Sequence, residues 1–485
     1  MKRLLLQSAY WLTFSKTTIQ FFNFFVTIYI ANLLLPSDYA LMGIAMVVIG
    51  MMQFFTEFGL SEVIVQRKEL LKTEINLIFW FAAFIGLLLS VSCFFIAAPA
   101  EAFFQKDGIK EIVRVLSIVL FLHSLSVVPY KLIDRKMKFK LKALIDLSAK
   151  VTSLLGAITF AHLGFGVWAL VYAQVIYVLV ITFASFTFEP FLPWFNLRLS
   201  SFKEITGFGL KIICLRALWY FRTQIGNIIG GKFLDAQVFG HYTVAFQLSR
   251  NLRSIILNVM SVLSVPVLSR YQDDNEKMNR AFLVMVKYLT ITTLPVFIGG
   301  CMLSREIITL LLPPKWLPAA PIFSVACLVS IFLMMNAIYE NLYIAKGKPH
   351  SSVIINFLMS VALTGSFLWG VQWGVNGLLI AWLIVLPLAF IGWTYFTLRD
   401  CQVSLFSYLK NLEPAAIGSL SMVLLLLPLK LILFRDIDSL QRFEMIPHLL
   451  FTIIAAALVY LIALYVKDAA IFSIFLNDKE AKTDI

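Results

Sequence analysis

Polar and basic side chains recur at helical spacing inside two long apolar stretches of the chain. The first stripe has intervals of three and four residues and consists of Thr13, Lys16, Gln20, Asn23 and Thr27. The second stripe has the same kind of spacing and consists of Arg216, Tyr220, Thr223 and Asn227. Residues three and four apart share one face of a helix, so each stripe predicts a polar face that carries a cation. Such a face can bind an anion, because an arginine fork donates two hydrogen bonds to a phosphate and a lysine adds a point charge.

Further charges lie in apolar stretches. Arg250 and Arg253 are one helical turn apart, and Arg222 lies within the second stretch. No acid stands three or four residues from Lys16, Arg216, Arg250 or Arg253. A charge at membrane depth costs at least about 2.5–3.5 kcal/mol on the insertion scale, so it normally faces a cavity or a partner. We therefore expect these cations to line a water-filled cationic lumen, with Gln53 beside them. The alternative is that they extend to the membrane surface or pair with acids.

Other charges in these stretches leave both interpretations open. Lys211 and Lys287 lie near the ends of their apolar stretches, where extension to the surface or pairing is favoured. Asp146 and Lys150 are four residues apart, so mutual neutralisation and a lumen role are equally plausible. Glu57 and Asp146 are the candidates for carrying a coupling proton or cation.

The composition identifies the class of protein that must position these residues. The 485 residues are 60% hydrophobic and only 14% charged, and the mean hydropathy is +0.88. A soluble domain has about 25% charged residues, so the composition excludes an ordinary soluble enzyme and predicts an all-α integral membrane protein. The five cysteines and five histidines show no metal-ligand spacing, and no GxxxxGK[ST] loop is present. We expect no metal, no cofactor and no direct use of ATP.

A membrane-spanning helix needs about 20 mainly apolar residues. On that criterion fourteen spans are expected, near 9–34, 39–64, 75–98, 112–133, 141–163, 166–188, 205–231, 236–268, 280–303, 319–342, 352–371, 374–397, 412–434 and 446–466. The side that holds both termini carries 23 Lys and Arg, the opposite side carries 9, and 8 lie inside spans. The positive-inside rule therefore predicts cytoplasmic termini. This topology accounts for most of the net charge of +13 without nucleic acid.

Two weak internal matches indicate a repeat. The segment 31–42 resembles 231–242 at a register of 200, and 163–170 resembles 373–380 at a register of 210. Each member of the second pair follows a basic loop, RKMK at 135–138 and AKGK at 345–348. The first register also places Lys16 on Arg216 and Gln20 on Tyr220. We expect two six-helix bundles around a central cavity, 1–200 and 201–400, and two additional helices with a cytoplasmic tail in 401–485. Parallel repeats of this kind are typical of transporters.

The opening of the chain resembles a known family. The segment 30–70 (IANLLLPSDYALMGIAMVVIGMMQFFTEFGLSEVIVQRKEL) and the segment 164–175 (GFGVWALVYAQV) are similar to the bacterial polysaccharide transporters of the Wzx type. The branch most resembled contains exporters of colanic acid and other exopolysaccharides, within the multidrug/oligosaccharidyl-lipid/polysaccharide exporter superfamily. The usual glycine of the turn pattern is replaced by Ala40. The resemblance implies two six-helix bundles with two further helices, and transport of undecaprenyl-diphosphate-linked oligosaccharide to the periplasmic leaflet of the bacterial inner membrane.

The first hypothesis for function is therefore a flippase that works by alternating access in exopolysaccharide, O-antigen or capsule synthesis. The diphosphate would bind Lys16, Arg216, Arg250, Arg253 and Arg222. The sugars would contact Gln20, Asn23, Tyr220, Thr223, Asn227 and Gln53. The alternative is a drug or small-ion antiporter of the same fold, although a lumen for cations should be acidic. A membrane enzyme would need a long extracytoplasmic loop, and no such loop is present. Membrane lipids, a polymerase and a chain-length regulator are the expected partners.

Overall fold

The computed structural model describes residues 2–57, 64, 71–191, 193–194, 220–221, 223–271, 274–435 and 442–469. Every regular element in these residues is a helix, with no strand among them. The chain forms two compact units. Unit 1 comprises Met1–Val244 and Asn356–Leu378, and unit 2 comprises Ala245–Ile355 and Leu379–Ile485. The expected boundaries at 200 and 400 stay a prediction.

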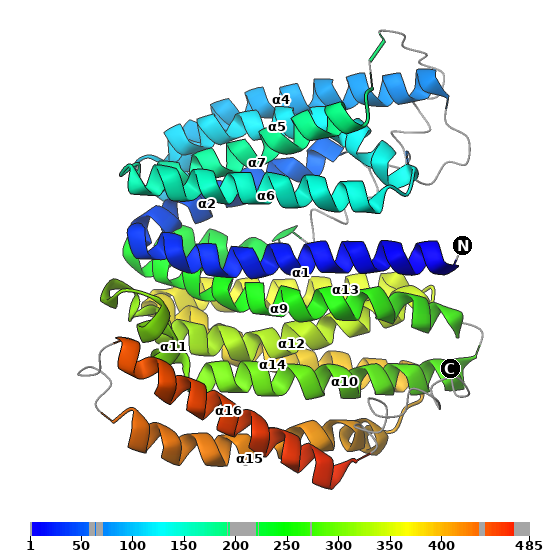
Figure 1. Ribbon diagram of the computed structural model, residues 1–485, viewed down its shortest axis with the longest axis vertical. Coiled ribbons are helices and arrows are strands. Elements are labelled where there is room, and N and C mark those ends of the chain that lie inside the picture. Colours follow the sequence, from blue (N-terminus) through cyan, green and yellow to red (C-terminus); the bar gives the residue numbers. More distant parts are fainter. Residues whose placement is uncertain are drawn as a thin grey trace. The chain divides into compact units, whose positions relative to one another are not determined.

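Unit 1 is built mainly from long helices in its N-terminal part (Figure 1). They are α1 (Lys2–Leu33), α2 (Pro36–Glu57), α4 (Lys72–Phe104), α5 (Ile109–Arg135), α6 (Phe139–His162) and α7 (Val167–Phe188). Helix α5 packs against α2, α4 and α7, and α6 packs against α1 and α7. Helical residues 223–233 and most of α13 (Pro349–Gly370) complete the unit.

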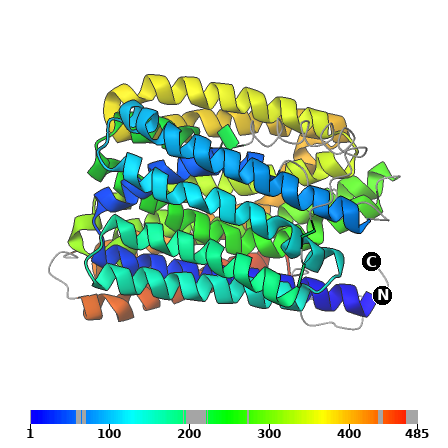
Figure 2. The same cartoon turned by 90° about the horizontal axis from the view of Figure 1, so that it is seen from above.

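Unit 2 contains the remaining helices. They are most of α9 (Ala236–Arg270), α10 (Asn275–Met302), α11 (Ser304–Leu311), η2 (Pro314–Trp316), α12 (Ala319–Ala345), most of α14 (Gly374–Cys401), α15 (Leu405–Leu433) and α16 (Arg442–Lys467). A short 3-10 helix, η3 (Val371–Trp373), connects α13 to α14. Helix α10 packs against α12 and α15, and α15 packs against α16. Figure 2 shows α1, α4, α5, α6 and α7 from a second side.

Nine helical segments within the described residues are long and apolar enough to cross a membrane. The chain is therefore a multi-pass membrane protein, and the number of fourteen spans stays a prediction. Helices α9, α12 and α14 begin at the residues that the sequence predicts, 236, 319 and 374. Other ends differ by up to seven residues, as at Leu405, where α15 begins before the expected 412. Helix α11 lies in a segment that was expected to be a loop, and the expected span 205–231 falls largely outside the described residues.

Local sequence explains the turn between α1 and α2. Pro36 is the first residue of α2, where its missing N–H costs nothing. The carboxylate of Asp38 accepts a 2.8 Å hydrogen bond from the Leu35 backbone N–H. A side chain at Gly240 would collide with this turn, because a Cβ there would lie 1.9 Å from the Pro36 carbonyl oxygen. The first turns of α9 therefore pack closely on the turn between α1 and α2.

Helix ends in the two parts of the chain follow both sequence registers. Helix α1 ends at residue 33 and α2 begins at 36, while the helix before α9 ends at 233 and α9 begins at 236. At the other register, α5 and α6 are separated by residues 136–138, and α12 and α13 by residues 346–348. Backbone φ is positive at Met137 (52°) and Gly347 (68°), and at Gly164 (80°) and Gly374 (65°). Helices α5 and α12 are also the most buried of the nine apolar segments, each with 61% of its most apolar window buried.

Candidate substrate-binding residues and two lysine clasps

The polar stripe of α1 belongs to unit 1. Gln20 and Asn23 are half-buried, and Thr27 is buried. The Thr27 carbonyl oxygen accepts a 3.3 Å hydrogen bond from the Tyr39 hydroxyl, which joins α1 to α2. The side chains of Thr13 and Lys16 lie outside the described residues. The lumen role predicted for this stripe stays a prediction.

Tyr220 packs against α2. Its side chain is buried, and its hydroxyl donates a 2.6 Å hydrogen bond to the Val47 carbonyl oxygen. Gly50 makes room for it, since a Cβ at that position would lie 2.5 Å from the tyrosine oxygen. The Thr223 hydroxyl donates to the Tyr220 carbonyl, and the Asn227 amide donates to the Gln224 side chain. The second stripe therefore has partners within its own unit. Arg216 and Arg222, its predicted cations, lie outside the described residues.

Of the two predicted ion-coupling acids, the structure describes the side chain of Asp146. Asp146 accepts a hydrogen bond from the Tyr130 hydroxyl. Its neighbour on the helix, Lys150, has its amine 5.6 Å from the centre of the Tyr177 ring. Gln53 is half-buried, and its carbonyl accepts a hydrogen bond from Thr56. The side chain of Glu57 lies outside the described residues.

Arg250 and Arg253 belong to unit 2. The Arg250 side chain is exposed, whereas Arg253 is half-buried. The Arg253 guanidinium donates a 3.4 Å hydrogen bond to the Ser330 hydroxyl. The Ser330 hydroxyl is in turn 2.8 Å from the hydroxyl of Ser249. No carboxylate of the described residues lies within salt-bridge distance of Arg253. The neutral Ser330 hydroxyl thus contacts this cation without neutralising its charge.

Other intramembrane charges of unit 2 are paired. Lys287 forms an ion pair with Asp468, the residue just after α16. This agrees with the pairing interpretation of Lys287. Lys430 of α15 is 3.1 Å from the buried carboxylate of Glu306 and donates to the Met302 carbonyl. Lys211 lies outside the described residues.

A lysine clasp closes one end of unit 1. The unit 1 clasp consists of Lys136 and Lys138, in the turn between α5 and α6, and Glu189, directly after α7. The carboxylate is only 8% exposed, while the lysine side chains are 51% and 46% exposed. Burial raises the pKa of the Glu189 carboxyl, but the two lysines outweigh this and hold the pKa below its ordinary value of 4.5. The clasp fastens the end of α7 to the α5–α6 turn.

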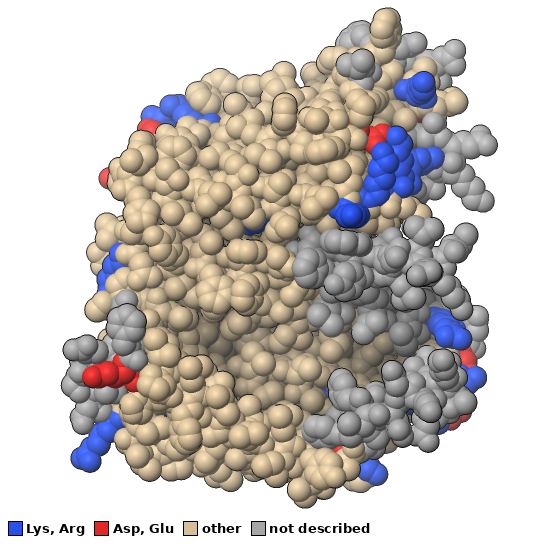
Figure 3. Space-filling view, viewed as in Figure 1, with Lys and Arg blue, Asp and Glu red and all other residues tan. Residues whose placement is uncertain are grey.

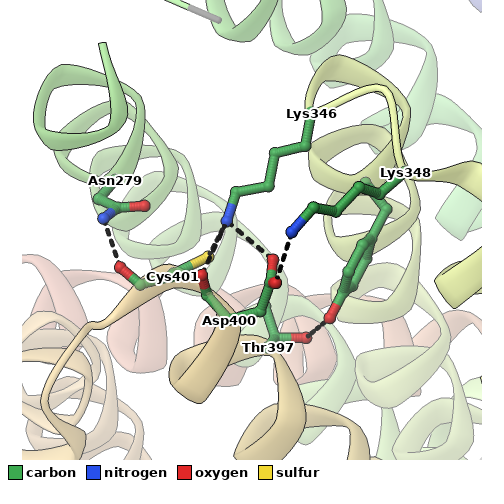
Figure 4. Close-up of polar contacts among 7 residues, drawn as sticks. Asn279, Lys346, Lys348, Thr397, Asp400 and Cys401 are labelled. Carbon is green, nitrogen blue, oxygen red and sulfur yellow. Dashed lines mark hydrogen bonds and ion pairs between the residues drawn. The ribbon is translucent and has the colours of Figure 1, made fainter. Parts of the chain in front are cut away.

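Unit 2 contains a similar clasp (Figure 4). The unit 2 clasp consists of Lys346 and Lys348, in the turn between α12 and α13, and Asp400 in the last turn of α14. The amines lie 3.0 and 2.9 Å from the carboxylate oxygens. The Lys346 amine also lies 3.1 Å from the sulfur of Cys401. Burial lowers the pKa of Lys346, but hydrogen bonds to Asp400 and Cys401 outweigh this and raise the pKa above 10.5.

The clasps were not predicted. The signal was available, because Lys-x-Lys occurs in both basic loops at a register of 210. The carboxylates were not identifiable in this way, since they lie 51–54 residues after the lysines. No group of three metal-ligating side chains occurs within the described part of the chain.

Comparison with models of known protein families shows which family this chain belongs to. The model of a family described as polysaccharide biosynthesis protein matches residues 29–321, more than half of the chain. The chain belongs to this family. An uncharacterized membrane protein in the cps region of Klebsiella pneumoniae is 22% identical, over 87% of this chain and 88% of its own length. The lipopolysaccharide biosynthesis protein WzxC of Escherichia coli K12 is 21% identical, over 73% of each chain.

Solved structures show that the fold is shared with transporters. The lipid II flippase MurJ in an inward closed conformation matches with a TM-score of 0.73 and 15% identity, over 94% of this chain and 99% of that one. An inward-facing multidrug resistance MATE transporter of the MOP superfamily matches with a TM-score of 0.63 and 17% identity, over 80% and 94%. At these identities the likeness establishes the fold, and the family match establishes membership among polysaccharide biosynthesis membrane proteins.

Proposed function

We propose that the protein is a flippase that moves undecaprenyl-diphosphate-linked oligosaccharide from the cytoplasmic to the periplasmic leaflet of the bacterial inner membrane. The observation that carries this proposal is the MurJ-like fold over 94% of a chain that belongs to a polysaccharide biosynthesis family. A flippase for a lipid-linked glycan would account for both the fold and the family membership. The protein would act as a transporter and not as an enzyme, beside a polymerase and a chain-length regulator.

The chemistry of the residues supports an anionic cargo. Arg253 contacts the Ser330 hydroxyl and has no carboxylate partner among the described residues, so its charge would be available to a diphosphate. Arg250, with an exposed side chain, would add a second arginine fork. Lys16, Arg216 and Arg222 are proposed to complete the cationic lumen. Gln20, Asn23, Gln53, Thr223 and Asn227 would contact sugar hydroxyls, while the polyprenyl chain stays in lipid.

Two repeated bundles would provide alternating access. The agreement of helix ends at registers of 200 and 210 supports an internal repeat of six helices, with fourteen spans in total. Rocking of the bundles would expose the lumen first to the cytoplasm and then to the periplasm. Both termini would be cytoplasmic, on the side of the lysine clasps, in accordance with the positive-inside rule. Glu57 or Asp146 would carry the coupling ion.

The decisive experiment measures the lipid-linked oligosaccharide in cells that lack the protein. Its leaflet is assigned by access to a periplasmic glycan-modifying enzyme, and its glycan is identified by mass spectrometry. We expect complete units to accumulate on the cytoplasmic leaflet. Complete units that still reach the periplasm, with no redundant exporter present, would refute the flippase proposal.

Charge reversal tests the lumen residues. Arg216→Glu and Arg253→Glu should each abolish glycan export while membrane insertion stays normal. The matched control is Arg280→Glu, because Arg280 is exposed in the first turns of α10. Normal export by both lumen variants would contradict the proposed phosphate-binding role.

An antiporter for drugs or small ions is the second candidate, because the MATE transporter shares the fold with a TM-score of 0.63. This candidate requires an acidic cation-binding lumen. Reconstituted protein that extrudes a cationic dye in response to a proton gradient, and leaves lipid-linked glycan in place, would favour the antiporter over the flippase.

A further inference from the structure

A row of polar side chains follows one side of α12 in unit 2. The row consists of Asn336, Tyr339, Tyr343 and Lys346, at intervals of three, four and three residues. Helix α12 is otherwise long and apolar enough to cross a membrane. Charged side chains gather at helix ends, and the sides of the helices are mostly uncharged (Figure 3). The row therefore leads from the unit 2 clasp, at Lys346, into an apolar interior.

Hydroxyl groups of α14 and α15 satisfy the middle of this row. The Tyr343 hydroxyl lies 3.5 Å from the Thr397 hydroxyl, beside the unit 2 clasp (Figure 4). The Tyr339 hydroxyl lies 3.1 Å from the Thr394 hydroxyl and 2.8 Å from the Tyr408 hydroxyl. All five side chains are buried. The tyrosines of the row thus have neutral hydrogen-bond partners within unit 2.

The inner end of the row is not satisfied in this way. The Asn336 side chain is 3% exposed, and neither its amide nitrogen nor its amide oxygen has a hydrogen-bond partner in the described part of the chain. The same is true of the indole nitrogen of Trp393, a side chain that is 1% exposed. The large majority of buried side-chain polar atoms are hydrogen-bonded, either to protein or to ordered water. These three atoms therefore indicate a bound molecule.

Ring contacts place Asn336 and Trp393 at the same interface. The Phe390 ring of α14 lies 5.5 Å from the Phe332 ring and 5.5 Å from the Tyr339 ring. Asn336 shares this side of α12, because it lies four residues after Phe332 and three before Tyr339. The Trp393 ring lies 5.7 Å from the Tyr339 ring. Both unsatisfied side chains are thus neighbours of Tyr339, on the facing sides of α12 and α14.

The types of unsatisfied atom identify the class of the bound molecule. The Asn336 nitrogen and the Trp393 nitrogen are hydrogen-bond donors, and the Asn336 oxygen is an acceptor. A hard cation needs several oxygen ligands and is opposed by the two N–H groups. An anion is opposed by the amide oxygen. A neutral molecule that both accepts and donates hydrogen bonds can satisfy all three atoms, and water is the smallest such molecule.

We propose that ordered water binds the amide of Asn336 and the indole nitrogen of Trp393. A buried water makes about two to four hydrogen bonds to polar groups that lack other partners, which is what this site offers. The interface of α12 and α14 is then hydrated at membrane depth, and the polar row continues from the unit 2 clasp to Asn336. This inference goes beyond the proposed transport function, since it concerns the interior of unit 2 and needs no cargo.

The test is hydroxyl-radical footprinting by X-ray radiolysis of the purified full-length protein in detergent. Radicals formed from ordered water oxidise the side chains beside it. Trp316 is the internal control, because it is as completely buried as Trp393. We expect Trp393 to be oxidised severalfold more than Trp316. After mixing with ¹⁸O-labelled water, Trp393 should acquire the label more slowly than the exposed Trp194, because the bound water exchanges slowly.

Variants connect this oxidation to Asn336. Asn336→Leu removes the amide with little change in volume and should lower Trp393 oxidation to the level of Trp316. The matched control is Asn411→Leu in α15 of the same unit, whose amide donates a 2.8 Å hydrogen bond to the Ser407 carbonyl oxygen. This control should leave Trp393 oxidation unchanged. Asn336→Ser keeps a polar group for the water and should retain the oxidation, which provides a test if Asn336→Leu does not fold.

Several results would overturn the proposal. They are equal oxidation of Trp393 and Trp316 in the unaltered protein, unchanged oxidation of Trp393 in Asn336→Leu, loss of the oxidation in Asn336→Ser, and ¹⁸O uptake at Trp393 as fast as at Trp194. Trp393 oxidation that falls when sodium replaces choline in the buffer would also overturn it and assign the site to a cation. Since no transport is measured, failure here leaves the flippase proposal intact.

Discussion

The two lysine clasps have the same backbone turn but opposite burial. In the unit 1 clasp the carboxylate is buried, with Glu189 8% exposed, and both lysines reach solvent. In the unit 2 clasp Lys346 is the buried member, 7% exposed, while Asp400 is 28% exposed. A buried charge destabilises the protein most when its partner is missing. Loss of the partner of the buried charge should therefore have the larger effect in each clasp. These partners are the two lysines in unit 1 and Asp400 in unit 2.

Removal of the carboxylate from the unit 2 clasp should have the largest effect. Asp400→Asn would leave the buried Lys346 ammonium without a carboxylate, with only neutral acceptors and the Cys401 sulfur as neighbours. We expect a loss of about 2–3 kcal/mol in the free energy of unfolding, measured by thermal and denaturant unfolding in micelles. The double variant Lys346→Met/Asp400→Leu should lose less, because it leaves no unpaired charge. A larger loss in the double variant would contradict this account.

Removal of the lysines from the unit 1 clasp should have an intermediate effect. Lys136→Gln/Lys138→Gln leaves the buried Glu189 carboxylate without a cation. We expect a loss of about 1–2 kcal/mol, since the glutamines can still donate hydrogen bonds. The comparison is the same unfolding measurement on Lys131→Gln, whose amine is 3.7 Å from Asp134 and 28% exposed, and which should change stability little.

Removal of the unit 1 carboxylate should have a smaller effect. Glu189→Gln frees two lysines that are about half exposed and can be solvated. We expect a loss below about 1 kcal/mol, which makes Glu189→Gln milder than Asp400→Asn. If the order of these two variants were reversed in the unfolding experiment, burial would not be the property that distinguishes the clasps.

The smallest expected effects are on the pH dependence of stability, which should differ between the two clasps. The pKa of Glu189 is lowered in the folded protein, so its contribution is present above the ordinary value of 4.5 and is lost as the pH falls through the lowered pKa. The pKa of Lys346 is raised, so its contribution is present below 10.5 and is lost as the pH rises through the raised pKa. In a plot of melting temperature against pH, Glu189→Gln should therefore reduce the decline at acidic pH. Asp400→Asn should reduce the decline at alkaline pH. An acidic decline that is unchanged in Glu189→Gln would contradict the assignment.

Sequence patterns predicted the helices better than the contacts. Apolar runs located α12 and α14 to the starting residue, because membrane spans are set by local hydropathy. Helical spacing also predicted that Tyr220, Thr223 and Asn227 share a face. It could not predict that the Tyr220 hydroxyl would bind the Val47 carbonyl, since that contact depends on how α2 packs. Helix α11 was missed because its eight residues are too short for a clear pattern.

The sequence by itself determined a multi-pass helical membrane protein and its two registers, because these follow from local composition and spacing, and its resemblance to a known family indicated the family that the comparison confirms. Only the tertiary structure decided the partners of the charges. Glu189 and Asp400 meet their lysines through the packing of helices 51–54 residues apart, and Arg253 meets Ser330 across 77 residues. Burial, which decides what each charge contributes, depends on all the neighbours in space and cannot be read from spacing along the chain.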